Sequence, residues 1–176
     1  MKKCKKAVSI LLIAAMLVLM LSGCGGKSVA TENTGSSEYR VCMITDAGDI
    51  TDQSFNQTTY ETCRDYCNEH NIDFTYKKPD GDTDYARTAM VDVAVAEGYN
   101  ILVMPGYVFA QTVVDTTFKY PDIKFIVLDM SAGDIGAAAV GNAYYDAPDA
   151  YNVADYYKTE NTYHAIYQDA IPGYLA

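Results

Sequence analysis

Short, predominantly apolar runs alternate with helix-length segments through the middle of this chain. Three of these runs have the composition of strands that are buried on both faces of a sheet, and they cover Tyr39–Ile44, Asn100–Met104 and Lys124–Leu128. A fourth run alternates apolar and polar residues around Phe74, as a half-buried strand does. Because a strand and a helix follow each other repeatedly, the sequence predicts an α/β fold.

Each gap between these runs has the length and periodicity of an amphipathic helix. The predicted helices cover Ser54–Asn68, a segment from Thr83 or Asp84 to Glu97, and Val108–Lys119. Asn71, Gly98 and Pro121 follow them as stops. The order βαβαβαβ with short connections predicts a parallel, doubly wound sheet with the flavodoxin-like strand order 2-1-3-4-5.

The periodicity is weaker beyond Met130. Here the sequence predicts a turn at Ser131–Gly136, a short strand at Ala137–Gly141, an irregular tyrosine-rich excursion with a helical turn at Asn142–Asn161, and a fifth strand at Thr162–Tyr167. Gln168–Ala176 is predicted to open a helix that tolerates Pro172 in its first turn.

Asp46, Gly106 and Asp129 each follow one of the predicted strands. In an open parallel sheet, ligands bind outside the carboxyl ends of the strands, and strands one, three and four are neighbours in the expected order. These three residues are therefore predicted to converge at one edge of the sheet. Ser54 is the expected N-cap of the first helix, whose free backbone N–H groups would add a partial positive charge to the same space.

The residues of this edge allow more than one interpretation. Asp46, Asp49 and Asp52 could bind calcium or magnesium, but an EF-hand needs a glutamate where Gln57 stands, so capping and turn formation are favoured. Phe55 is a core residue by helical spacing, or a flat apolar plate for an aromatic ligand. Asp129 either caps a strand end or accepts hydrogen bonds from a ribose diol.

Met1–Cys24 has the marks of an export signal. Several lysines precede the apolar stretch Ala7–Leu21, which is too short for a comfortable membrane span. Leu21-Ser22-Gly23-Cys24 resembles the bacterial lipobox, which would make Cys24 the lipidated first residue; an ordinary secretory signal or an uncleaved anchor is the alternative. Residues 25–38 are predicted to be a flexible tether that spans on the order of 20 Å. The folded domain is expected over residues 39–176.

Charge and side-chain chemistry exclude several function classes. The chain has 23 acidic and 13 basic residues and a formal net charge of −10, a field that repels phosphate backbones, so nucleic acid is not an expected partner. Neither His70 nor His164 accompanies a nucleophile set, and no phosphate-binding or dinucleotide glycine pattern exists. An enzyme is therefore disfavoured, and no catalytic residue, metal or cofactor is predicted.

Three cysteines lie in the expected domain, at Cys42, Cys63 and Cys67. A structural zinc site needs about four ligands, and a disulfide between residues four apart on a helix is geometrically awkward. We therefore expect buried, reduced thiols, which behave as small hydrophobic side chains.

The residues Asp46, Gly48, Asp52, Ser54, Phe55, Asn56 and Gln57 form a specific motif. It closely resembles the start of the mature basic membrane protein (BMP) family, whose members are lipid-anchored substrate-binding proteins of ABC importers and often take up purine nucleosides. The resemblance continues to Ile126–Asp129, and it resumes at Tyr167–Asp169 and Gly173–Ala176.

The resemblance implies part of the N-terminal lobe of a type I periplasmic-binding-protein fold. It implies that Phe55 stacks on a purine base and that Asp46 and Asp129 line the cleft. Asn56, in a supporting or capping role, and Gly106 complete the predicted ligand-binding set. The resemblance also implies an ABC permease as partner and a lipid anchor at Cys24 on the extracytoplasmic face of the cell membrane.

Some features depart from the family pattern. The tyrosine-rich loop at Asn142–Asn161 is unusually long, and Ala170 stands where an acid is usual. Family members continue into a second lobe, so we expect an incomplete fold with roughly millimolar nucleoside binding. Two competing hypotheses are an enzyme that uses Asp46 or Asp129 as a metal-bound or general-base carboxylate, and a surface interaction lipoprotein without a small ligand.

Overall fold

A computed structural model describes residues 38–166 of the chain. Within this range, five parallel strands form one sheet in the order β2-β1-β3-β4-β5. They are β1 (Arg40–Ile44), β2 (Asp73–Lys77), β3 (Ile101–Pro105), β4 (Lys124–Leu128) and β5 (Thr162–Ala165). The predicted α/β class and strand order are confirmed.

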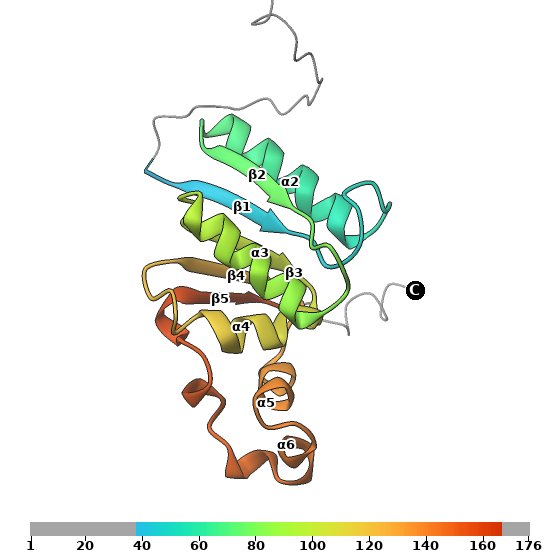
Figure 1. Ribbon diagram of the computed structural model, residues 1–176, viewed down its shortest axis with the longest axis vertical. Coiled ribbons are helices and arrows are strands. Elements are labelled where there is room, and N and C mark those ends of the chain that lie inside the picture. The colour runs from blue at the N-terminus through green and yellow to red at the C-terminus, as the bar shows by residue number, and fades with distance from the viewer. Residues whose placement is uncertain (1–37, 167–176) are drawn as a thin grey trace, which may run out of the picture. The chain divides into compact units, whose positions relative to one another are not determined.

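Helices lie on both faces of the sheet. They are α2 (Phe55–Glu69), α3 (Asp84–Ala96), α4 (Ala110–Thr116), α5 (Ala132–Val140) and α6 (Asn142–Asp146), and a short 3-10 turn, η1 (Tyr107–Phe109), precedes α4. Figure 1 shows α3 and α4 on one face, while α2 lies against β1 and β2 on the other. The doubly wound arrangement follows from right-handed crossovers that run in opposite directions from β1.

Two apolar clusters hold the layers together, because successive side chains of a strand point to opposite faces. The larger cluster joins Cys42, Leu102 and Phe125 of the sheet to Val91 of α3 and Val113 of α4. The smaller cluster lies beneath α2 and contains Val41, Met43, Val103 and Cys67. Burial raises the pKa of the Cys42 thiol to about 12.

The ends of α3 follow local rules. The Thr83 hydroxyl accepts a hydrogen bond from the backbone N–H of Ala86 at 3.1 Å, as an N-cap does. Beyond the helix, Gly98 adopts a φ of 87°, a left-handed conformation that favours glycine. The predicted bounds of this helix are therefore confirmed.

The predictions for Ser131–Gly136 as a turn and Ala137–Gly141 as a strand are wrong, because both segments belong to α5. Ser131 and Asp134 form a capping box: the Ser131 hydroxyl accepts from the Asp134 N–H at 3.2 Å, and the Asp134 carboxylate accepts from the Ser131 N–H at 2.7 Å. The box satisfies N–H groups of the first turn, and the alanines that follow have high helix propensity.

The third predicted helix, Val108–Lys119, is shorter in the structure. It begins as η1 and ends with α4 at Thr116. The hydroxyls of Thr116 and Thr117 donate to backbone carbonyls one turn earlier, at 2.6 and 2.9 Å.

The tyrosine-rich segment is irregular, as predicted. After α6 it contains the 3-10 turns η2 (Pro148–Ala150), η3 (Val153–Asp155) and η4 (Thr159–Asn161). Tyr144 packs against Gly136 of α5 so closely that a Cβ on Gly136 would lie 2.3 Å from the Tyr144 ring. Tyr156 and Tyr157 pack against the larger cluster, so this segment is anchored to the lobe.

Several predictions lie outside the described residues. These are the leader with Cys24, the tether before Glu38, Tyr167, and the helix at Gln168–Ala176. Over residues 38–166, no helix has the length and apolar character needed to cross a membrane.

Candidate ligand-binding site

Asp46, Gly106 and Asp129 lie at the same level across three neighbouring strands. Met43 is paired with Val103, and Pro105 with Leu128; extending this register places Gly106 between the two aspartates. The N–H of Gly106 donates to the Leu128 carbonyl at 2.8 Å, which carries the pairing past the end of β3. Because strands are spaced about 4.8 Å apart, the two aspartate backbones are separated by about 10 Å.

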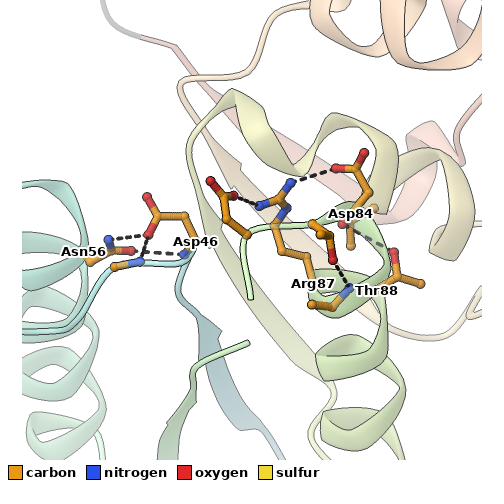
Figure 2. A network of polar contacts seen from close by, with 10 residues as sticks. Asp46, Asn56, Asp84, Arg87 and Thr88 are labelled. Carbon is orange, nitrogen blue, oxygen red and sulfur yellow. Dashed lines mark hydrogen bonds and ion pairs between the residues drawn. The ribbon is translucent and has the colours of Figure 1, made fainter. Parts of the chain in front are cut away.

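Asn56 fixes the side chain of Asp46 (Figure 2). Asn56 is buried, and its Nδ2 donates to Asp46 Oδ1 at 2.8 Å while its Oδ1 accepts from the Asp46 N–H at 3.3 Å. The N–H of Gly48 donates to the same Asp46 oxygen. Within residues 38–166, the second carboxylate oxygen of Asp46 has no such donor, so it can accept a hydrogen bond from a ligand. Asn56 supports Asp46 in this geometry.

Ser54 occupies the N-cap position of α2, as predicted, but the side chain that accepts the capping hydrogen bonds is that of Asp52. The Ser54 side chain makes no capping bond, whereas the Asp52 carboxylate accepts from the N–H groups of Ser54, Asn56 and Gln57 at 2.8, 3.3 and 3.1 Å. Burial acts to raise the pKa of Asp52, but these hydrogen bonds outweigh it and lower the pKa. The expectation that free N–H groups present a partial positive charge is therefore wrong, because Asp52 takes them up.

Phe55 begins α2 directly after this loop. Its side chain is only partly buried, and it belongs to neither apolar cluster of the described residues. Its partial burial fits both interpretations, a core residue and an aromatic plate, so the role of Phe55 stays a prediction. An aromatic face at this place can contact a planar ligand.

Gly106 and Asp129 have backbone conformations that are unusual for most residues. Gly106 adopts φ 109° and ψ 152°, a region open essentially to glycine alone. Asp129 adopts a φ of 53°, and its N–H donates to the Ala165 carbonyl at 2.7 Å. Left-handed backbone in a non-glycine residue costs about 1–3 kcal/mol and is concentrated at functional sites. Both residues direct the chain sharply away from the sheet edge.

Arg87 is a residue of this edge that sequence analysis missed. Its side chain is 7% exposed, and its guanidinium pairs with Asp82 and Asp84 at 2.7 and 2.8 Å, as Figure 2 shows for Asp84. It also lies 6.0 Å from the centre of the Phe109 ring, so it joins the turns that follow β2 and β3. A sequence signal existed, because Arg87 shares one helical stripe with the buried Val91 and Ala94.

Asp49, the remaining aspartate of the loop between β1 and α2, makes local contacts. Asp49 accepts from the hydroxyl and the N–H of Thr51 and lies 3.4 Å from the Lys78 ammonium, and the Thr51 hydroxyl bond helps to lower the pKa of Asp49. In the part of the chain that the structure describes, no three His, Cys, Asp or Glu side chains are arranged to hold a metal ion. The edge therefore offers hydrogen-bond acceptors and one aromatic face.

Known proteins share this sequence pattern. The family model described as "ABC transporter substrate-binding protein PnrA-like" matches residues 39–158. A lipoprotein from Pyrococcus abyssi is 27% identical over 77% of this chain and 32% of its own length. The ABC transporter nucleoside-binding protein BmpA of Lactococcus lactis subsp. cremoris is 25% identical over 71% of this chain and 36% of its own.

A solved structure shares the fold. The crystal structure of a lipoprotein fragment from Peptoclostridium difficile 630 has a TM-score of 0.52 and 20% identity, and the match covers 78% of this chain and 93% of that one. The chain spans about a third of the length of the curated relatives it matches, given the covered shares of 32% and 36%.

Proposed function

We propose that this chain, which belongs to the Bmp family of PnrA-like ABC transporter substrate-binding proteins, forms one wall of a binding site for a purine nucleoside. The observation that carries the proposal is the alignment of Asp46 and Asp129 on either side of Gly106, at the carboxyl edge of the sheet. Phe55 adds an aromatic surface at the start of α2.

Each residue of this edge has a separate role in the proposal. Phe55 stacks on the base, because a purine is flat and apolar on its faces. Asp129 accepts hydrogen bonds from the ribose hydroxyls, and Asp46 accepts one from the polar edge of the base. Gly106 lets the ligand approach the backbone between them, since it has no side chain there. Asn56 acts through Asp46 by holding its carboxylate.

The whole protein acts, in this proposal, as a lipoprotein on the extracytoplasmic face of the cell membrane. Cys24 carries the lipid, residues 25–38 connect it to the lobe at residues 39–176, and the bound nucleoside passes to an ABC permease. Two observations support this: the family is one of ABC transporter substrate-binding proteins, and one relative is named a lipoprotein. We propose binding without turnover, since the edge combines acceptors with an aromatic face.

Ligand-observed NMR tests this proposal at the millimolar affinities expected. Inosine, adenosine and guanosine are titrated into the purified chain, with ribose and uracil as smaller controls. We expect saturation transfer to the base and ribose protons, and a loss of at least about tenfold in affinity for Asp129→Asn or Phe55→Ala, equivalent to about 1.4 kcal/mol. Asp115→Asn, an exposed aspartate of α4, is the matched control.

Two results would contradict the proposal. One is the absence of transfer for every purine nucleoside up to about 10 mM, a range that covers the weak binding estimated for one lobe. The other is binding that Asp129→Asn and Asp115→Asn weaken equally. Release of free base during the titration would instead support the competing enzyme.

A further inference from the structure

The turn after β3 has an unusual conformation that neighbouring residues must hold. Gly106 adopts φ 109° and ψ 152°, and such sparsely populated conformations persist only where the surrounding structure fixes them. The Phe109 N–H donates to the Gly106 carbonyl at 3.3 Å, so Phe109 closes the turn, and Phe109 is 0% exposed. The position of Gly106 therefore depends on what holds Phe109 in place.

Arg87 of α3 packs against the Phe109 ring. The Arg87 Cζ lies 6.0 Å from the centre of this ring, at the limit of a cation–π contact. One residue further along α3, the Thr88 hydroxyl donates to the Thr112 hydroxyl of α4 at 3.5 Å, which brings the two helices together just beyond the turn. The start of α3 is thus in contact with the segment that leaves the carboxyl end of β3.

Two aspartates fix the guanidinium of Arg87 in this position. Asp82 and Asp84 lie on either side of the N-cap residue Thr83, and they accept from Nη1 and Nη2 of Arg87 at 2.7 and 2.8 Å. Arginine suits such a place because its planar guanidinium presents several donors in a fixed fork, whereas the ammonium of a lysine is a single point charge. The two bonds therefore set the position of Arg87 relative to the start of α3.

Stability alone does not explain why a charged side chain is buried here. The Arg87 Nε has no hydrogen-bond partner among residues 38–166, and an unpaired buried donor destabilises a fold. Asp82 and Asp84 are 75% and 54% exposed, so water would hydrate both carboxylates if Arg87 were removed. An apolar side chain of similar volume is often neutral or stabilising in place of a buried charge. These features indicate that Arg87 has a conformational role.

We propose that Arg87 is a positioning residue for the carboxyl edge of the sheet. It holds Phe109 against α3 and thereby keeps Gly106 between Asp46 and Asp129, where the ligand approaches the backbone. This inference rests on the proposed nucleoside site, and it adds to that site a residue that acts without touching the ligand. Without Arg87, the turn samples other conformations while the sheet stays folded.

Amide hydrogen exchange of the full chain, followed by NMR, tests the order of the turn without any ligand. Arg87→Met removes the fork of donors but keeps a long side chain. Val91→Ala is the matched control, because Val91 is a buried residue one turn further along α3. We expect Arg87→Met to raise the ratio of the Gly106 exchange rate to the Leu102 exchange rate by about tenfold, since only the turn opens. Val91→Ala lowers the stability of the whole lobe through a cavity and should not raise that ratio.

Inosine binding is measured on the same three chains by ligand-observed NMR. We expect Arg87→Met to weaken binding by about fivefold or more and Val91→Ala to leave it within about twofold. Urea unfolding should show the opposite order, with Val91→Ala the less stable variant. A residue that only stabilised the fold would give affinity losses that follow the losses of stability.

Several results would overturn the inference. One is an unchanged exchange ratio in Arg87→Met, and another is an equal rise of that ratio in Val91→Ala. Unchanged inosine binding in Arg87→Met despite faster exchange at Gly106 also overturns it. If the original chain binds no inosine, the proposed function fails, whereas the exchange ratio still decides whether Arg87 holds the turn. If Arg87→Met does not fold, Arg87→Lys is measured by the same criteria, because one ammonium cannot replace the fork.

Discussion

Asn56 and Asp46 exchange two hydrogen bonds, one from Asn56 Nδ2 to Asp46 Oδ1 at 2.8 Å and one from the Asp46 N–H to Asn56 Oδ1 at 3.3 Å. This pair fastens the start of α2 to the end of β1. Asn56 Nδ2 also donates to Asp52 at 3.0 Å, so one buried amide organises two carboxylates of the motif.

Asn56→Ala should weaken both stability and ligand binding. It removes the buried partner of Asp46, and the loss of such hydrogen bonds costs about 1–3 kcal/mol in the free energy of unfolding. Affinity for a purine nucleoside should fall as well, since Asp46 loses its fixed orientation. Urea unfolding and ligand-observed NMR measure the two effects, with the exposed Thr58→Ala of the same helix as control. Full affinity in a destabilised Asn56→Ala variant would show that Asp46 needs no support.

Asp52→Ala and Ser54→Ala should differ in their effect on α2. Asp52 accepts from three backbone N–H groups, so its loss should cost about 1–2 kcal/mol. Ser54→Ala should change the free energy of unfolding by less than about 0.5 kcal/mol, because its side chain makes no cap bond. Urea titration measures the free energy of unfolding of both variants. A larger loss of stability in Ser54→Ala than in Asp52→Ala would contradict the capping role assigned to Asp52.

The same carboxylate should make stability depend on acid pH. The pKa of Asp52 is lowered in the fold, so its contribution is present above the unfolded value of about 3.9 and is lost as the pH falls through the folded pKa. Comparing unfolding of the original chain and Asp52→Asn between pH 6 and about pH 3 isolates this effect. The stability difference should shrink toward low pH, and a constant difference would argue against the shift.

Gly106→Ala and Gly81→Ala form a matched pair of glycine substitutions. A Cβ at Gly106 would meet no atom closer than 3.9 Å, yet the φ of 109° is strained for alanine, so the backbone alone should cost about 1–3 kcal/mol. Gly81 has open space and no such φ, so Gly81→Ala should be neutral or stabilising by up to about 1 kcal/mol. Thermal unfolding measures the midpoint temperature of each variant. Equal midpoints would show that the backbone at residue 106 adopts another conformation without loss of stability.

Gly136→Ala should have opposite effects in two backgrounds. In the original chain, the new Cβ would fall 2.3 Å from the Tyr144 ring and should destabilise the packing of α6 on α5. In a Tyr144→Ala background the clash is gone, and alanine should stabilise α5 by up to about 1 kcal/mol through its helix propensity. A double-mutant cycle of unfolding free energies measures the coupling. If the effects of Gly136→Ala and Tyr144→Ala on the free energy of unfolding add, the Tyr144 ring moves away from the new Cβ without cost.

The strands and α3 could be predicted from the sequence because their signals are local. The continuous apolar runs of β3 and β4 are typical of strands that are buried on both faces of a sheet. Thr83 and Gly98 mark the two ends of α3, because Thr83 caps the helix and Gly98 adopts a positive φ. The alternation of strands and helices predicted a doubly wound sheet, for which the flavodoxin-like order was expected, and the strand pairings confirm that order. Ser131 and Asp134 give α5 a local start signal as well, but the alanine- and glycine-rich run that follows has no clear amphipathic period, so the helix is hard to predict from periodicity.

Only the tertiary structure decided which partners the side chains of the site contact. Ser54 and Asp52 are both plausible caps by type, and only the path of the loop brings the Asp52 carboxylate to the helix N–H groups. The partners of Arg87 include Phe109, which lies on another helical turn far along the chain. An apolar groove beside α2, lined by residues that include Val41, Ile101 and Ile126, depends on which strands the helix fails to cover, a property of how layers overlap in space that no single segment encodes.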